Sequence, residues 1–269
     1  MKTSIKHVVI SGGASGLGLG LASRYLKRGV FVSILDLSVT AETKALLDNL
    51  AKSQKGKWAF LKTDVTQAKL IKDNIQASIS AFGPIDLAIN SAGILINKCL
   101  EDTSPDEFKR VIDVNLNGSF NFASAVLPTL QRGARLALIS SMAGLFSNYA
   151  YSAYGASKFG VVGLATTLRY EYEHKGIYIS CVCPPEVKTP MVEKELTNGN
   201  PVSLAMKKFG GSMEADDACD QIVAALDAGK WMVIPSINGK LLATFARHFP
   251  APFFSLTKQV IKYTEKKFS

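Results

Sequence analysis

Tyr154 and Lys158 are the residues whose types and spacing most directly suggest chemistry. They are four positions apart, so they share one face if the segment is a helix. A tyrosine titrates at about pH 10, but a nearby ammonium stabilises the phenolate and lowers the pKa. Such a tyrosine can exchange a proton with an alcohol or a ketone, and Ser141 can donate a hydrogen bond to the same substrate oxygen. The alternative is an amphipathic helix face without a catalytic role.

A glycine-rich turn near the N-terminus suggests a phosphate-binding site. The apolar run Val8 to Ile10 ends in Ser11, and Gly12, Gly16 and Gly18 follow before a helical pattern begins. A helix N-terminus offers unpaired N–H groups and partial positive charge to a pyrophosphate, and glycines let the backbone approach the anion. A plain tight connection between strand and helix is the alternative.

Asp36 follows the second apolar run, Val30 to Leu35. A carboxylate at this place can accept hydrogen bonds from the ribose of adenosine. It would repel a 2′-phosphate, and neither Ser15 nor Leu37 supplies a compensating cation. We therefore expect NAD rather than NADP as cofactor. A structural Asp36 that only caps a turn is the alternative.

The elements that must position these residues alternate between strands and helices. Short apolar runs predict strands over 5–11, 30–35, 58–63, 85–89, 135–140, 177–182 and 231–234. Helical patterns lie between them, over 17–28, 41–53, 70–82, 104–131, 152–174 and 215–228. This alternation predicts an α/β fold, a doubly wound parallel sheet of about seven strands with helices on both faces. Ligands bind beyond the carboxyl ends of such strands, where the polar and glycine residues named above fall.

Composition limits the class of protein. The 269 residues are 47% hydrophobic and 20% charged, which suits one α/β domain with a sizeable core. We find no apolar run long enough to span a membrane and no signal peptide, so a cytoplasmic location is expected. The four cysteines are expected to be reduced, and the three histidines are too scattered to form a metal site.

The formal charge of +9 is concentrated at the C-terminus, where seven basic residues and one acid follow from Lys230 onward. This distribution argues against a nucleic-acid surface along the whole chain. Residues 236–269 read as a basic amphipathic extension with apolar residues at helical spacing. Such a tail can lie on an anionic membrane surface, cover a neighbouring subunit, or cover the substrate mouth of its own chain.

The motifs in their order resemble the short-chain dehydrogenase/reductase family. They are Ser-Gly-x3-Gly-x-Gly from Ser11, Asn-Ser-Ala-Gly from Asn90, Asn115, Ser141 and Tyr-x3-Lys. The resemblance covers residues 5–235 and implies a Rossmann fold and hydride transfer between a nicotinamide cofactor and a secondary alcohol or ketone. It implies that Tyr154 is the general acid/base, that Lys158 lowers its pKa and binds the nicotinamide ribose, that Ser141 polarises the carbonyl and that Asn115 holds a water.

The resemblance also implies the cofactor contacts and the assembly. The expected contacts are Gly12, Ser15, Gly16, Leu17, Gly18, Asp36, Asp64, Val65, Asn90, Ala92, Gly93, Tyr154, Lys158, Pro184, Val187 and Thr189. A homodimer or homotetramer is expected. Three positions depart from the family pattern: Ser11 replaces a threonine, Ser91 an asparagine, and Pro185 a glycine. The last change stiffens the segment that leads to Thr189.

Substrate choice is expected to depend on residues 186–213, a segment that reads as a mobile lid within a single domain of residues 1–235. Its apolar residues are Met191, Val192, Leu196, Leu204, Met206 and Phe209. They favour an apolar, lipid-like or steroid-like substrate, or they only pack the lid on the body. The pair Pro184-Pro185 and the tail resemble reductases of long-chain 3-keto-sphingoid bases, the alternative substrate. A non-catalytic cofactor sensor or scaffold on the same fold is the alternative function.

Overall fold

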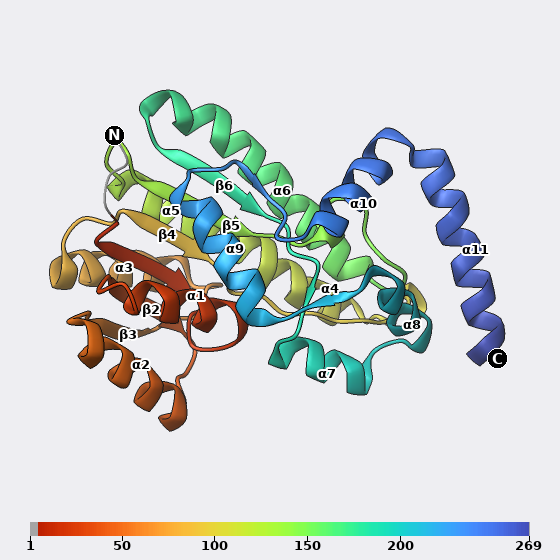
Figure 1. Cartoon of the computed structure of the whole chain (residues 1–269), viewed down its shortest axis with the longest axis horizontal. Helices are drawn as coiled ribbons and strands as arrows, with labels where there is room; N and C mark the ends of the chain where they lie inside the picture. The colour runs from red at the N-terminus through yellow and green to blue at the C-terminus, as the bar shows by residue number, and fades with distance from the viewer. Residues whose placement is uncertain (1–4, 269) are drawn as a thin grey trace.

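Seven parallel strands form the central sheet of the computed structural model (Figure 1), which describes residues 5–268 apart from the side chains of residues 208–210. Their spatial order is β3-β2-β1-β4-β5-β6-β9. The bounds are β1 (His7–Ser11), β2 (Phe31–Asp36), β3 (Trp58–Lys62), β4 (Leu87–Asn90), β5 (Arg135–Ile139), β6 (Tyr178–Val182) and β9 (Met232–Val233). The order reverses between β1 and β4, so the predicted doubly wound sheet is confirmed.

Helices cover both faces of this sheet, each burying one apolar side. The helices on one face are α1 (Gly16–Leu26), α2 (Ala41–Gln54) and α9 (Ala215–Asp227). Those on the other are α3 (Ala68–Phe82), α5 (Gly118–Val126) and α6 (Ser152–Tyr172). Because both faces are covered, the strands are nearly continuous apolar runs. Cys181 and Cys183 on and after β6 are fully buried, as expected for small core residues.

The helix expected over 104–131 is divided into several segments. It begins with α4 (Pro105–Ile112), where Ser104 and Glu107 form a capping box. A π-helical segment follows (Asp113–Asn117), and then α5 begins at Gly118. A Cβ at Gly118 would lie 2.8 Å from Val65 Cγ2, so the helix passes close to the loop after β3 at this point. The widened turn places Asn115 in the interior.

The segment expected to be a lid is a small substructure of its own. Strands β7 (Glu186–Val187) and β8 (Ser212–Met213) pair in parallel, and between them lie α7 (Pro190–Asn198) and α8 (Pro201–Gly210). Met191, Val192 and Met206 line the main cavity, whereas Leu196 is exposed. The expected contribution of Phe209 lies outside the described side chains.

The C-terminal tail forms two helices, α10 (Ile237–His248) and α11 (Pro250–Phe268), at the end of the molecule farthest from β3 (Figure 1). Helix α11 packs against α8, and Phe253 stacks edge-on with Phe146 at a centroid distance of 5.2 Å. Within residues 5–268, none of the helices has the length and apolar character needed to cross a bilayer.

Candidate active site

One cavity of about 1060 Å³ opens at the carboxyl ends of the strands. Most of the residues expected to bind the cofactor or to catalyse line it: Gly12, Ser15, Gly16, Leu17, Gly18, Asp36, Asp64, Val65, Ala92, Gly93, Ser141, Tyr154, Lys158, Pro184, Val187 and Thr189. Asn90 and Asn115 lie behind this wall. The cavity extends from the glycine turn to helix α11, so segments far apart in the sequence meet in one space.

The glycine turn has the shape that a phosphate-binding loop requires. Gly12 has φ +65°, and a Cβ there would lie 2.6 Å from the Ala92 amide nitrogen. A Cβ on Gly18 would lie 2.0 Å from the Gly12 oxygen, so helix and turn pack backbone to backbone. Ser15 caps α1 without a side-chain capping bond, and the first turn of the helix faces the cavity. The backbone N–H groups of this first turn are donors that fit the pyrophosphate of a dinucleotide.

Asp36 combines two tasks at the end of β2. Its carboxylate accepts hydrogen bonds from the Ala14 N–H at 3.0 Å and the Leu37 N–H at 2.8 Å, and it also lines the cavity. The turn-capping alternative is therefore part of its role. Asp64 likewise accepts from the Thr66 N–H and hydroxyl at 2.9 and 2.8 Å, which shapes the turn after β3.

Asn90 has a structural role in the interior. Its Oδ1 accepts from the Ser11 hydroxyl at 2.5 Å, and its Nδ2 donates to the Ser119 hydroxyl at 2.7 Å. The side chain is buried and used by protein partners, so it ties β1, β4 and α5 together behind the cavity. Serine at position 11 still provides the hydroxyl that this bridge needs.

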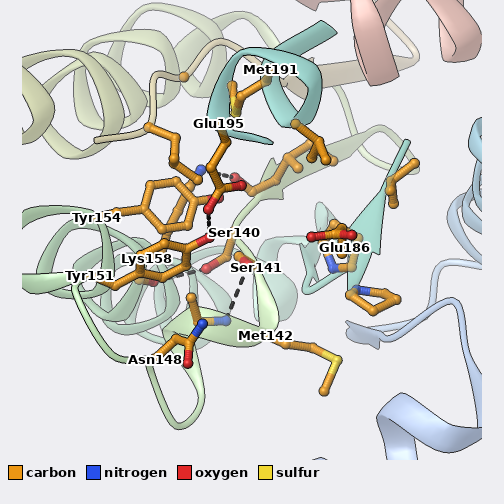
Figure 2. Close-up of a pocket in the computed structure, with 18 of the residues that line it drawn as sticks. Ser140, Ser141, Met142, Asn148, Tyr151, Tyr154, Lys158, Glu186, Met191 and Glu195 are labelled. Carbon is orange, nitrogen blue, oxygen red and sulfur yellow. Dashed lines mark hydrogen bonds between the residues drawn. The ribbon is translucent and has the colours of Figure 1, made fainter. Parts of the chain in front are cut away.

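Tyr154 and Lys158 share one face of α6, as their spacing predicts, and both are buried (Figure 2). Lys158 Nζ lies 5.6 Å from the centroid of the Tyr154 ring and donates to the Ile139 oxygen at 3.0 Å. Ser141 follows β5 on the same side, with its hydroxyl accepting from the Ala143 N–H at 3.1 Å. The three side chains meet at the boundary between the glycine turn and the lid.

The expected lowering of the Tyr154 pKa is wrong for the protein alone. Burial raises the pKa of Tyr154 to about 12, against a lowering by the Ser141 hydroxyl. Burial also lowers the pKa of Lys158 to about 8, because desolvation disfavours the ammonium. The nearby Glu195 and Cys183 add to the raising of the Tyr154 pKa. Tyr154 therefore carries its proton at neutral pH.

Asn115 lies in the π-helical segment, and its side-chain amide is held by protein partners. Its Oδ1 accepts from the Ile94 N–H at 2.8 Å, while its Nδ2 donates to the Ile94 oxygen at 2.9 Å and to Ser157 at 3.0 Å. A Cβ at Gly93 would lie 3.2 Å from Asn115 Oδ1 and 3.6 Å from Lys158 Nζ. Asn115 thus fixes the loop after β4 directly behind Lys158.

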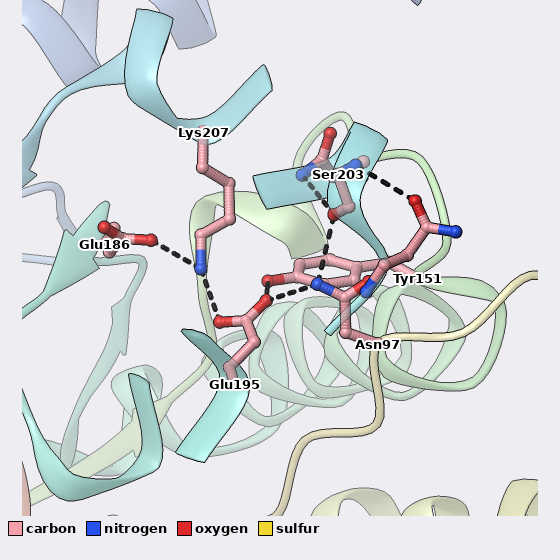
Figure 3. A network of polar contacts seen from close by, with 8 residues as sticks. Asn97, Tyr151, Glu186, Glu195, Ser203 and Lys207 are labelled. Atoms are coloured by element: carbon pink, nitrogen blue, oxygen red, sulfur yellow. Dashed lines mark hydrogen bonds and ion pairs between the residues drawn. The ribbon is translucent and has the colours of Figure 1, made fainter. Parts of the chain in front are cut away.

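Sequence reasoning missed a second polar group in the cavity wall. The cavity wall includes Glu186, Glu195, Lys207 and Tyr151, which come from separate parts of the lid and from the position before α6. Figure 3 shows the polar contacts that join them. No motif marks them in the sequence, because ordinary lid residues and an ordinary helix start have the same composition. It also missed Met142 as part of the wall, and it left a cover by the tail as one of three alternatives.

This arrangement, a dinucleotide cradle that meets a tyrosine, a lysine and a serine, defines an oxidoreductase, and the comparisons agree. A family model described as short chain dehydrogenase matches residues 6–199. The 3-dehydrosphinganine reductase TSC10B of Arabidopsis thaliana is 38% identical over 248 residues, covering 88% of this chain and 72% of that protein. The D-beta-hydroxybutyrate dehydrogenase of Rhizobium meliloti is 31% identical over 193 residues, covering 71% of this chain and 75% of that protein.

Solved structures show the same fold. The crystal structure of levodione reductase superposes with a TM-score of 0.77 at 28% identity, covering 88% of this chain and 97% of that chain. The chain belongs to the short-chain dehydrogenase/reductase family. It is an oxidoreductase of the kind that uses a nicotinamide cofactor, as the sequence motifs predicted.

Proposed function

We propose that the protein reduces a long-chain ketone, with Tyr154 as the acid that protonates the nascent alcohol. The observation that carries this proposal is the place of the protonated Tyr154, beside Ser141, where the cradle for the cofactor meets an apolar cavity. Reduction of a ketone consumes a proton, and a tyrosine that holds its proton at neutral pH is in the form that this direction requires.

The nicotinamide cofactor supplies the hydride when it is bound. Ser141 donates a hydrogen bond to the substrate oxygen, which stabilises the negative charge that develops there. Tyr154 then gives its proton to that oxygen. The Lys158 ammonium, held by the Ile139 oxygen under the tyrosine ring, stabilises the phenolate that remains. Asn115 acts through the loop that it holds, behind Lys158. These roles argue against the non-catalytic alternative.

The apolar wall supports a lipid-like substrate. Beyond Tyr154, the cavity is lined by apolar side chains from the lid and from both tail helices: Met191, Met206, Leu242, Phe245, Phe253, Leu256 and Val260. Such a wall favours an alkyl chain. The relative named as a 3-dehydrosphinganine reductase acts, by its name, on a long-chain keto base. We therefore propose a 3-keto-sphingoid base, which the sequence analysis gave as the alternative, as the preferred substrate.

We propose NAD as the preferred cofactor. The Asp36 carboxylate faces the cavity at the end of β2, where a 2′-phosphate would add negative charge beside it. Its two backbone hydrogen bonds hold the charge in place. The neighbouring Leu37 is exposed and apolar, so it offers no compensating cation.

The assembly and location stay predictions. We propose a cytoplasmic location. We also propose that the protein forms a homo-oligomer, because the side chains of Phe120 on α5 and Phe159 on α6 are exposed. We also propose that residues 236–269 are an extension of a core of residues 1–235. Exposed Leu241 and Tyr263 stand among the lysines of this extension, and this pattern supports peripheral contact with an anionic membrane.

The first prediction tests Tyr154. Replacing Tyr154→Phe removes the acid and leaves the ring, so kcat for a long-chain 3-ketone should fall by a factor of about 10³. The measurement is NADH or NADPH oxidation followed at 340 nm. Tyr170→Phe, which changes an exposed tyrosine of the same helix, serves as the control. Full activity of Tyr154→Phe would contradict the assignment, and no turnover of any long-chain ketone by the unchanged protein would contradict the function.

A further inference from the structure

A cluster of charged side chains (Figure 3) forms part of the wall of the cavity that also contains Tyr154. Glu186 lies on β7, directly after Pro184-Pro185, while Glu195 lies on α7 and Lys207 on α8. Lys207 Nζ is 2.5 Å from Glu186 Oε2 and also pairs with Glu195 Oε2. One ammonium is thus shared between two carboxylates.

Glu195 is the inner member of this cluster. Its side chain is fully buried, and its Oε1 accepts from Asn97 Nδ2 at 2.7 Å and from the Tyr151 hydroxyl at 2.6 Å. Its Oε2 pairs with Lys207. Both oxygens are used by protein groups, so Glu195 holds α7 and α8 against α6 rather than contacting a ligand. Tyr151 in turn packs edge-on against Tyr154, with ring centroids 5.1 Å apart.

Glu186 is the member that the cavity can reach. Its side chain is 17% exposed, and among the described side chains Lys207 is its one ion-pair partner, through Oε2. All three of Glu186, Ser141 and Tyr154 line the same cavity, and in the view of Figure 2 Ser141 lies between the other two. The remaining oxygen of Glu186 is therefore an acceptor in the wall of the cavity that also holds Ser141 and Tyr154.

The charges of this region do not balance. Glu186 and Glu195 carry two negative charges against the single positive charge of Lys207. Nearby Lys188 is exposed and pairs with Glu214, and Lys158 donates to the Ile139 oxygen below Tyr154. Among the described side chains, the cluster keeps a net charge of −1. A half-buried negative charge is costly unless a cation pairs with it, so this wall favours a ligand that brings one.

We propose that Glu186, backed by the Lys207–Glu195 pair, binds the ammonium of a ketone whose amino group is on the carbon next to the carbonyl. The inference rests on the ketone reductase function proposed above. With the carbonyl oxygen between Ser141 and Tyr154, an ammonium one carbon away lies at the Glu186 side of the cavity. The alkyl chain then extends along the apolar wall that α10 and α11 supply. Glu186 is in this way a specificity-determining residue.

The test compares two ligands that differ in the amino group alone. Isothermal titration of the full chain uses a 2-amino-1,3-diol and the matching 1,3-diol, with alkyl chains short enough to stay monomeric. The unchanged protein should bind the amine at least about tenfold more tightly. Glu186→Gln should abolish this preference while leaving the affinity for the plain diol unchanged. Glu186→Asp, which keeps the charge, should retain most of the preference.

The matched control is Glu214→Gln, which removes an exposed carboxylate directly after the lid and should behave as the unchanged protein. Equal affinity of the unchanged protein for both ligands would overturn the inference. So would an equal loss of both affinities in Glu186→Gln with its far-ultraviolet circular dichroism intact. Preferential binding of the amine without reduction of the corresponding ketone would contradict the proposed function and leave the ammonium site standing.

Discussion

Asp36 shows how one side chain can serve the fold and the ligand together. Its oxygens hold the Ala14 and Leu37 amides, and its charge faces the end of the cavity where we place the adenosine. Asparagine keeps the size and one acceptor but removes the charge. We expect Asp36→Asn to narrow the preference for NADH over NADPH by about tenfold, because the repulsion of the 2′-phosphate is lost.

Fluorescence titration of both reduced cofactors measures this preference directly. Asp73→Asn, an exposed carboxylate on α3, is the control and should leave both affinities unchanged. Tighter binding of NADPH than of NADH to the unchanged protein would show that the Asp36 argument is wrong.

At the scale of elements, helix α11 closes the far end of the cavity. Phe253, Leu256 and Val260 line the cavity, and Phe253 also packs on Phe146 and on Phe245 of α10. Of the three roles that the sequence left open for the tail, this lining supports the cover over the mouth of its own cavity. The exposed apolar and basic outer side leaves room for the membrane role as well.

The effect of deleting residues 250–269 should therefore depend on the length of the alkyl chain of the substrate. We expect kcat/KM for a long-chain ketone to fall by about tenfold or more, since several methylenes lose their apolar wall at about 0.8 kcal/mol each. A short-chain ketone should be reduced at the unchanged rate, which also controls for folding. Sedimentation with anionic liposomes tests the outer side: if the deletion does not weaken binding, membrane contact through α11 is ruled out. An equal loss for both ketones would contradict the role of α11 in the cavity.

At the scale of the whole molecule, His7 links the first two strands to α3. It is buried, with its ring nitrogens 2.9 Å from the Gly83 oxygen and 3.2 and 3.0 Å from the Ser33 and Ser78 hydroxyls. Burial lowers the pKa of His7 below its usual value of about 6.5, against a smaller raising by Gly83 and Asp86. The folded protein thus takes up this proton less readily than the unfolded chain.

The sign of the pH effect follows from that difference. The stability that His7 contributes is fully present above about pH 6.5 and is lost as the pH falls toward the lower pKa of the folded state, because the unfolded chain binds the proton first. Urea unfolding at pH 7.5, 6.5 and 5.5 should show a falling free energy of unfolding. His7→Gln should flatten this part of the profile, and His174→Gln, at an exposed position, should not. An unchanged slope in His7→Gln would contradict the argument.

The sequence by itself determined the alternation of strands and helices, the doubly wound sheet, the glycine cradle and the face shared by Tyr154 and Lys158. These features depend on contacts between near neighbours or on the edge of a parallel sheet, so spacing and residue type predict them. Element bounds differ by a few residues, and the helix after β4 contains a π-helical segment that a linear pattern of residue types does not predict.

Only the tertiary structure decided which polar groups share the cavity and in which direction the pKa of Tyr154 is shifted. Glu186, Glu195 and Lys207 come from three separate elements, and no periodicity predicts that they meet. The raised pKa of Tyr154 likewise depends on how completely the fold removes water from the site, and this desolvation exceeds the lowering by the Ser141 hydroxyl. Local spacing brings residues onto one face, but burial and charge balance are sums over the whole surrounding structure.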